Sequence, residues 1–495
     1  MKKFTITVIS LFMVLLISLS AVGEAMGTSS KYASNQDYIQ SENLALRDKS
    51  NKMTDGKDSS VCRFKTRNGG ESIIDLGESC DFNSVILKEK GLNVQKFSIS
   101  VSDDNENFTQ IYANDKIEFH RLCTFDTVKA RYVKLTVEKS DNLPKIREME
   151  IYNAVPEKKN DFRVSTYSTL GGSVFGIIDD TTLSDAEKDA KIKELIDADY
   201  YDTVTDYIDI GNVRWDEEGI IHTDGWDGIE RDEDKYYAVM MRNLHEVLDE
   251  KGVNLVITIP SGENGNQRVM KSITENRDTL ITNMIAFANK YEFDGIDLDW
   301  EFPLSQDEFD AYNSFLQELK ARMKTEMWNK EDATLSLALA TWALKYTPET
   351  IECIDYVNVM GYDILDQDGQ HSSFFSSCVQ AADYIEIQGF SKEQINIGFP
   401  FYGTWEGGRM EQYAYNAISE EISPFNNFYT MKKSDTKEDR YTYFNSQAII
   451  RDKTAYAYLK GYGGVMIFSQ YCDLPSDDER SLTKAISDYL QEVTK

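Results

Sequence analysis

Acidic and apolar residues alternate strictly from Ile296 to Glu301. An alternation with a period of two is typical of a β-strand with two different faces. Asp297, Asp299 and Glu301 therefore project from one face, and the apolar residues between them pack on the other. Three ionised carboxylates this close together repel one another, so at least one should keep its proton near neutral pH. Because Phe293 and the apolar face favour burial, the segment predicts a buried strand that carries a general acid, rather than a solvated edge strand.

Four acids in this segment share a recognisable spacing. Asp294, Asp297, Asp299 and Glu301 follow the pattern Asp-x-x-Asp-x-Asp-x-Glu. The pattern resembles the signature of glycoside hydrolase family 18, and its Trp-Glu-Phe-Pro ending is similar to the chitinase branch of that family. The resemblance implies an α/β TIM barrel, with the signature on the fourth strand and Glu301 at the C-terminal rim. Active sites of such barrels are built at that rim.

The chain is organised in several segments, because 495 residues are too many for a single ordinary domain. Residues 155–161 are polar and include Pro156, so we interpret them as a linker between two independent cores. The remaining segments are a signal peptide at 1–25, a flexible leader at 26–37, a β-sandwich at 38–154 and a barrel at 162–495.

The N-terminus has the features of a secretory signal. Lys2 and Lys3 precede an apolar run from Phe4 to about Val22, and Gly23-Glu24-Ala25 offers a small-x-small cleavage site. A retained membrane anchor is the alternative interpretation. No later apolar stretch is long enough to span a bilayer. We therefore expect a secreted, extracellular protein without a transmembrane segment after signal removal.

The composition disfavours several classes of partner and cofactor. The 84 Asp and Glu residues outnumber the 53 Lys and Arg residues, so nucleic acid and anionic membranes are poor partners. The six Cys and four His form no Cys-x-x-Cys or His-x-x-x-His pair, which disfavours zinc chemistry. We expect a monomer that needs no cofactor for catalysis and binds no metal in the barrel.

Short strands that alternate apolar and polar residues fill residues 38–154 and predict an antiparallel β-sandwich. This region resembles the discoidin-like, or factor 5/8 type C, domains, which share a jelly-roll, galactose-binding-like fold with many carbohydrate-binding modules. Four segments carry the resemblance: 74–77, 100–104, 130–135 and 146–152. A carbohydrate-binding role and a purely structural role both remain open.

One loop of this domain is similar to a calcium site found in some of its relatives. The loop contains Asp55 and Asp58, and the resemblance adds Glu148 from the end of the domain. One loop and one acid underdetermine a calcium shell, because calcium takes six to eight oxygen ligands. A structural calcium ion and an ordinary polar turn are therefore both open.

Beyond the linker, strands alternate with helical stretches, which is the pattern of βα units. A (β/α)8 barrel suits this length. We expect its strands at 162–168, 207–213, 254–259, 295–301, 334–340, 356–362, 395–400 and 464–468. Helices are expected at 186–198, 278–291 and 305–323. A full helix-plus-sheet insertion is not expected between Gly403 and Gly463, so the groove should be shallow.

The other site motifs follow the sixth, seventh and eighth predicted strands. Met360-Gly361-Tyr362-Asp363 resembles the Met-x-Tyr-Asp motif of the family, which implies that Tyr362 and Asp363 face the sugar. Met360 belongs to the same motif, and Tyr402 lies near the end of a segment that resembles the seventh strand of the family. Trp405 is a further substrate-binding candidate, since ligand sites are enriched in aromatic residues. Phe468 stands where the family usually has a Trp beneath the reacting sugar, and it offers less stacking area.

The resemblance also implies a mechanism in which the substrate assists its own cleavage. Glu301 would protonate the glycosidic oxygen while the N-acetyl carbonyl of the sugar attacks its own anomeric carbon. Asp299 would stabilise the resulting ring, Tyr362 would bind the acetamido group, and Asp297 would hold the shared proton. The substrate must then carry a 2-acetamido group.

Chitin or chito-oligosaccharides, cleaved with retention at β-1,4 bonds, are the first expectation. An endo-β-N-acetylglucosaminidase acting on the chitobiose core of N-glycans uses the same chemistry, and peptidoglycan is a third substrate. An inactive glycan-binding barrel is a different class, which the presence of Glu301 disfavours. The sequence leaves endo and exo action open.

Overall fold

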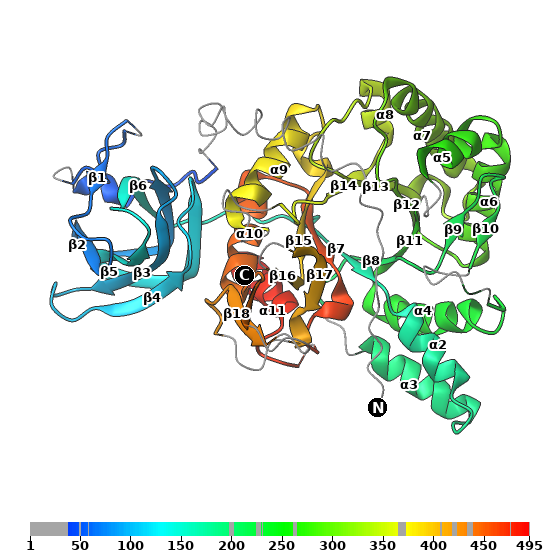
Figure 1. Ribbon diagram of the computed structural model, residues 1–495, viewed down its shortest axis with the longest axis horizontal. Helices are drawn as coiled ribbons and strands as arrows, with labels where there is room; N and C mark the ends of the chain where they lie inside the picture. The colour runs from blue at the N-terminus through cyan, green and yellow to red at the C-terminus, as the bar shows by residue number, and fades with distance from the viewer. Residues whose placement is uncertain are drawn as a thin grey trace.

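The computed structural model contains an N-terminal β domain and a C-terminal barrel that lie side by side (Figure 1). The signal peptide and leader predicted at 1–37 lie outside the described residues. No described helix is long and apolar enough to cross a membrane. The described residues are 38–48, 51–57, 59–197, 202–223, 229, 231–260, 265–364, 373–405, 408–417, 423–432, 439–475 and 477–494.

The N-terminal domain is a six-stranded antiparallel sheet in the order β1-β6-β2-β5-β3-β4. The sheet curves around its own core, as in a β-sandwich (Figure 1). β2 and β5 are 20 residues long, and their pairing shifts register between Asp75 and Cys80. Such irregularities let a long strand bend. The strands are β1 (Cys62–Arg63), β2 (Gly70–Glu89), β3 (Val94–Ser102), β4 (Thr109–Asn114), β5 (Arg121–Ser140) and β6 (Lys145–Tyr152).

The second unit is a closed barrel of eight parallel strands in the order β11-β12-β13-β14-β15-β20-β7-β8. The TIM-barrel prediction is confirmed. The strands are β7 (Arg163–Ser168), β8 (Asp206–Asp209), β11 (Asn254–Pro260), β12 (Gly295–Asp299), β13 (Thr334–Leu339), β14 (Tyr356–Val359), β15 (Ile395–Pro400) and β20 (Gly464–Phe468). β12 and β14 end earlier than expected, so Glu301 and Tyr362 lie just beyond the strands.

Helices alternate with these strands and cover the outside of the barrel (Figure 1). They are α2 (Gly171–Asp179), α3 (Asp185–Asp197), α4 (Tyr237–Lys251), α5 (Gly265–Thr274), α6 (Arg277–Lys290), α7 (Gln306–Glu326), α8 (Pro348–Cys353), α9 (Phe375–Ile387), α10 (Gln447–Lys460) and α11 (Leu482–Thr494). The start of α7 could be predicted because its capping residues are present in the local sequence. Ser305 and Glu308 form a capping box at its first turn, which satisfies N–H groups that the helix cannot bond itself.

A second antiparallel sheet follows β15. It contains β16 (Tyr402–Trp405), β17 (Gly408–Ala414), β18 (Phe428–Lys432) and β19 (Asp439–Tyr443), in the order β17-β16-β19-β18. The interval between Gly403 and Gly463 therefore holds a sheet that sequence analysis did not locate, while its described residues include no α-helix before α10. The barrel helix α10 begins only at Gln447, which leaves the earlier part of the interval free to form strands.

The two units share their apolar cores. Tyr38, Ile86 and Leu122 of the N-terminal domain belong to the core of the barrel, while Ala448 of α10 belongs to the core of the N-terminal domain. Lys159 donates from its backbone N–H to the hydroxyl of Tyr458, at 2.7 Å. The prediction of two independent cores is therefore wrong. The linker sequence at 155–161 gives no sign of these contacts, because the side chains that make them are far apart in the sequence.

Candidate active site

The acidic strand β12 lies between β11 and β13, and its carboxylates run toward the C-terminal rim of the barrel. Asp297 is fully buried, Asp299 ends the strand, and Glu301 is exposed on the loop that follows. The period-two pattern thus places three acids in one line from the interior to the rim. A glycine at 295 permits the close strand packing here, because a Cβ would meet the hydroxyl oxygen of Thr334 at 2.1 Å.

Asp297 accepts hydrogen bonds from hydroxyl groups on three other strands: β7, β11 and β13. Its Oδ2 accepts hydrogen bonds from Tyr167 and Thr258, each at 2.9 Å, and its Oδ1 accepts one from Ser336 at 2.6 Å. Burial raises the pKa of Asp297, and these hydrogen bonds act in the opposite direction because they favour the ionised form. The side chain is therefore fixed beneath the other two acids.

Sequence reasoning missed these hydroxyl residues and the amide that supports them. Asn358 donates to the hydroxyl of Tyr167 at 3.1 Å, and its own carbonyl accepts from Asn396 at 3.1 Å. The available signal was a single polar residue at an inward position of an apolar strand, as in Leu335-Ser336-Leu337. Buried polar groups of this kind almost always have partners.

Asp299 and Glu301 are the two acids that can share a proton. Burial raises the pKa of Asp299 well above its usual value, and the charges of Glu301 and Asp297 add to the effect. Burial also raises the pKa of Glu301, helped by the charge of Asp363. Glu301 is reached by solvent at the rim, yet enough protein surrounds it to disfavour its charge. The Oδ1 of Asp299 is buried and accepts no hydrogen bond from the described residues.

Aromatic rings surround the acids on the side of β14, β15 and β20. The ring of Phe468 stacks on Tyr362, with centroids 5.8 Å apart and planes at 17°. Tyr402 and Tyr167 meet the Phe468 ring at steep angles, with centroids 6.3 and 6.0 Å away. Burial raises the pKa of Tyr362 well above its usual value, followed by the charges of Asp363 and Glu301. The motifs predicted after three strands thus meet at one place.

The remaining substrate-binding candidates are Met360, Trp405 and Asp363. Met360 lies directly after β14 and is half-buried. Trp405 belongs to β16 by its backbone, but its side chain lies outside the described part of the structure. Asp363 adopts a left-handed backbone with φ of 57° and its N–H donates to the hydroxyl of Ser373 at 2.9 Å.

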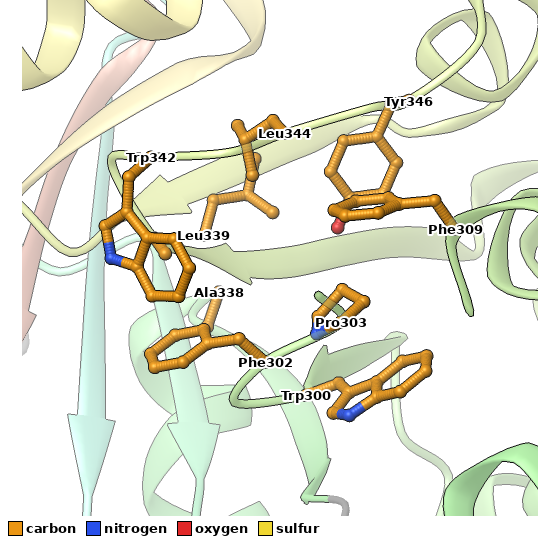
Figure 2. Close-up of a pocket in the computed structure, with 10 residues that line it drawn as sticks. Trp300, Phe302, Pro303, Phe309, Ala338, Leu339, Trp342, Leu344 and Tyr346 are labelled. Carbon is orange, nitrogen blue, oxygen red and sulfur yellow. The ribbon is translucent and has the colours of Figure 1, made fainter. Parts of the chain in front are cut away.

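A small aromatic pocket is lined by Trp300 and Phe302, the sequence neighbours of Glu301, and by residues of β13 and the segment after it (Figure 2). Phe302, the residue after Glu301, meets Trp342 edge to face with centroids 4.9 Å apart. Trp300 lines the deeper part and packs against Tyr312 at 5.0 Å. Phe302 and Trp342 therefore place aromatic surface beside the segment that carries Glu301.

The calcium candidates form a turn in the N-terminal domain. The backbone N–H of Lys57 donates to Asp55 at 3.0 Å and to Glu148 at 2.8 Å, and the hydroxyl of Ser60 donates to Asp55 at 2.9 Å. Burial raises the pKa of Glu148 to about 7, and the charge of Asp55 adds to it. The Oε2 of Glu148 is buried without a hydrogen-bond partner among the described residues. Asp58 lies outside the described residues.

These oxygens are of the type that calcium prefers, and a bound ion or water would give the buried Oε2 of Glu148 a partner. Within the described residues, however, no group of three or more His, Cys, Asp or Glu side chains is arranged to hold a metal ion. Carbonyl oxygens would therefore have to complete the shell.

Comparison with known proteins agrees with this geometry. The model of the family described as "Glycosyl hydrolases family 18" matches residues 213–473, which is more than half of the chain. The chain belongs to glycosyl hydrolases family 18. The model of the F5/8 type C domain matches residues 29–149, so the family 18 barrel follows a discoidin-like domain, as predicted.

Relatives of this family 18 chain include proteins named as chitinases. Chitinase A1 of Niallia circulans is 27% identical over 269 residues, which cover 42% of this chain and 38% of that protein. The class V chitinase of Arabidopsis thaliana is 27% identical over 177 residues, which cover 31% and 46%. The killer toxin subunits alpha/beta of Kluyveromyces lactis are 38% identical over 104 residues, which cover 18% and 9%. The chain thus spans less than half the length of each of these relatives.

Solved structures show the same fold. The Group IV chitinase of Ostrinia furnacalis has a TM-score of 0.51 and 18% identity, and the match covers 67% of this chain and 100% of that chain. Catalytic domain 2 of the Group II chitinase of the same insect has a TM-score of 0.51 and 16% identity, with coverage of 67% and 97%.

Proposed function

We propose that this family 18 protein is a retaining glycosidase that hydrolyses β-1,4 bonds of N-acetylglucosamine-containing glycans, with chitin or chito-oligosaccharides as substrates. The observation that carries the proposal is the line of three acids at the barrel rim. Asp297, the innermost acid, accepts hydrogen bonds from three hydroxyl groups, while burial raises the pKa values of Asp299 and Glu301. Relatives named as chitinases support the choice of substrate.

In the first step, Glu301 gives its proton to the glycosidic oxygen, and the bond between this oxygen and the anomeric carbon breaks. The acetamido carbonyl oxygen of the same sugar forms the new bond to the anomeric carbon, which gives a cyclic oxazolinium ion. Family 18 is the recognised exception to the two-carboxylate mechanism, because the substrate supplies the nucleophile. Asp299 stabilises the charge on this ring, and the hydroxyl of Tyr362 donates to the acetamido oxygen.

In the second step, Glu301 takes a proton from water while that water attacks the anomeric carbon and opens the ring. Two displacements at one carbon return the product to the starting configuration. Asp297 lies directly below Asp299 in the line, so the shared proton moves toward Asp297 when Asp299 turns to the substrate. The hydroxyl groups that donate to Asp297 stabilise its ionised form and so offset part of the cost of burying that charge.

The aromatic rings position the glycan beside the acids. Phe468 and Tyr362 form a stacked floor for the reacting sugar, since apolar faces of sugars pack on aromatic rings. Phe302, which follows Glu301 in the sequence, and Trp342 would add a second aromatic surface for the glycan. Met360, Asp363, Tyr402 and Trp405 complete the proposed set of binding residues.

N-glycans and peptidoglycan would be cleaved by the same chemistry, and assays on the three substrates distinguish these possibilities. We would assay a fluorogenic chitobioside, a high-mannose glycoprotein and peptidoglycan side by side, with Glu301→Gln as the inactive control. Preferred turnover of the chitobioside supports the proposal, while preferred release of the N-glycan identifies an endo-β-N-acetylglucosaminidase. If the wild-type protein binds but cleaves none of them, it is a glycan-binding barrel instead.

The N-terminal turn is proposed as a structural calcium site. Asp55, Glu148 and Ser60 would supply side-chain oxygens, with Asp58 as the resemblance implies, and carbonyl oxygens would complete the shell. The orphaned oxygen of Glu148 and its carboxylate neighbour Asp55 support this assignment. The ion would neutralise two acids that otherwise repel each other. It takes no part in catalysis.

Secretion is likewise part of the proposal. It is supported by the sequence of residues 1–25, in which two lysines precede an apolar run and a small-x-small site. The protein would act as a monomer outside the cell, where insoluble glycans occur. N-terminal sequencing of the protein recovered from the medium tests this, because the mature chain should begin after residue 25.

A further inference from the structure

Glu118 of the N-terminal domain reaches across to helix α9 of the barrel. Its buried carboxylate accepts hydrogen bonds from the backbone N–H groups of Phe375, at 3.3 Å, and Ser376, at 2.5 Å. The first N–H groups of a helix lack intrahelical partners and carry partial positive charge. No side chain within α9 caps its first turn, because a phenylalanine, Phe374, stands at the N-cap position and the first turn contains no acid. A carboxylate from the other domain supplies the cap.

The neighbours of Glu118 hold this contact in place. The guanidinium of Arg121 lies 3.9 Å from the Glu118 carboxylate and 5.2 Å from the centre of the Phe375 ring. The hydroxyl of Ser376 donates to the carbonyl of His120 at 3.4 Å. Burial raises the pKa of Glu118, while Arg121 and the hydrogen bonds from Ser376 lower it. Glu118, His120 and Arg121 of the N-terminal domain therefore all contact the first turn of α9.

The capped turn is directly connected to the candidate active site. Ser373 lies two residues before α9, and its hydroxyl accepts from the N–H of Asp363 at 2.9 Å. The N–H of Ser373 donates to the carbonyl of Ile364 at 3.1 Å, and its carbonyl accepts from Lys453 at 2.8 Å. Ser373 therefore links the start of α9, by its position in the chain, to α10 and to the segment that carries Tyr362 and Asp363, by its hydrogen bonds.

We infer that Glu118 is a positioning residue of the candidate active site, which acts through the first turn of α9 and Ser373 to fix the backbone of Asp363. The inference rests on the proposed function. It gives the discoidin-like domain a second role besides any glycan binding, because part of the support of the active site comes from outside the barrel.

Loss of the Glu118 contact should change the pKa of Glu301. Asp363, Asp299 and Tyr362 are the titratable groups that interact electrostatically with Glu301, and the charge of Asp363 contributes to the raised pKa of Glu301. If Asp363 loses its fixed position, this contribution weakens and the pKa of Glu301 falls. The general acid then loses its proton at a lower pH, so the basic limb of the pH–rate profile moves to lower pH.

The test compares two buried interface residues of the N-terminal domain. Glu118→Gln keeps the shape of the side chain but leaves an amide facing two N–H donors. Asn114→Ala is the matched control, because Asn114 accepts from Asn427 at 2.6 Å and is not among the residues that contact α9 here. Turnover of a fluorogenic chitobioside, its pH profile and the melting temperature are measured for the full chain.

We expect Glu118→Gln to lower kcat by about tenfold with little change in KM, since small misplacements of catalytic groups cost this much or more. Its basic limb should move to lower pH, while Asn114→Ala should change the melting temperature without moving that limb. The same pH profile in Glu118→Gln and wild type, or an equal shift in Asn114→Ala, would overturn the inference.

Ser373→Ala provides a second test that does not depend on the folding of Glu118→Gln. It removes the acceptor for the N–H of Asp363 from the barrel side, so it should shift the basic limb in the same direction. An unshifted limb in Ser373→Ala would also overturn the inference. A wild-type protein that cleaves no glycan would refute the proposed function and this role with it, whereas unchanged variants of an active protein refute only the role.

Discussion

At the scale of single residues, the acids of the site were predictable and their supports were not. The alternation from Ile296 to Glu301 fixes which side chains share a face, and this is a property of any strand. Tyr167 and Ser336 bond Asp297 from other strands, so no local pattern places them next to it. Phe468 was placed by its position at the end of the eighth strand, and the structure brings its ring against Tyr362.

Phe468→Trp tests whether this ring forms the floor of the site. The larger ring adds stacking area, so kcat/KM on chito-oligosaccharides should rise by about fivefold, equivalent to about 1 kcal/mol. Phe468→Tyr, which adds no ring, serves as the control and should give a smaller change. A loss of N-glycan cleavage with linear substrates spared would indicate that the smaller ring makes room for a branched core. Unchanged kinetics on both substrates would remove Phe468 from the site.

Asp363→Asn tests the electrostatic account of Glu301. Catalysis needs protonated Glu301, so activity falls as pH rises through its pKa, which burial and Asp363 raise above the usual value. Removing the charge of Asp363 lowers this pKa, and the basic limb of kcat/KM should move to lower pH. A limb that stays in place or moves to higher pH would show that Asp363 does not act on Glu301 through its charge.

At the scale of elements, periodicity located the barrel strands and the longest helices to within a few residues. Strands such as β11 and β15 are mostly apolar and buried, and α7 begins with a capping box, so both kinds of element can be located from the local sequence. The sheet of β16 to β19 was missed because its segments are short and pair only with each other. Their stability depends on partners that a sequence window does not contain.

The turn of Asp55 and Glu148 gives an element-scale prediction. The pKa of Glu148 is raised to about 7 in the folded protein, so its contribution to stability is present at low pH and is lost as pH rises through about 7. Calcium binds the ionised carboxylate and should restore that stability. We therefore expect calcium to raise the melting temperature more at pH 8 than at pH 5.

Thermal melts with calcium and with a chelator at both pH values measure this effect. Glu148→Gln is the matched control, because it keeps the size of the side chain and removes the charge that titrates. It should melt at nearly the same temperature with and without calcium. An equal calcium effect in wild type and in Glu148→Gln would show that the ion binds elsewhere.

At the scale of the whole molecule, a buried polar network joins the two domains. Asp452 of α10 is fully buried, and it accepts hydrogen bonds from Arg121 at 3.1 Å, Tyr112 at 2.6 Å and Thr124 at 2.8 Å. Burial raises the pKa of Asp452 to about 6, and the charge of Arg121 opposes this shift. Such a network between residues more than 300 positions apart is invisible in the sequence, which is why two separate cores were expected.

Asp452→Ala should lower the free energy of unfolding by about 3–5 kcal/mol, the usual cost of leaving a buried charge without its partner. Deletion of residues 38–154 would expose the same surface, together with the apolar residues of α10, so the isolated barrel should be insoluble or unfolded. Denaturant unfolding of the full chain should show a single transition. Two separate transitions, or a soluble and active barrel fragment, would contradict the account.

The central claim is that Glu301 and the acetamido group of the substrate together cleave the glycosidic bond. The most direct test compares a fluorogenic chitobioside with the matching cellobioside, which has hydroxyl groups in place of the acetamido groups. Wild-type protein should cleave only the chitobioside, and Glu301→Gln should lower its turnover by about 10²- to 10⁴-fold without unfolding the protein. Comparable cleavage of the cellobioside, or near-normal turnover by Glu301→Gln, would contradict the claim.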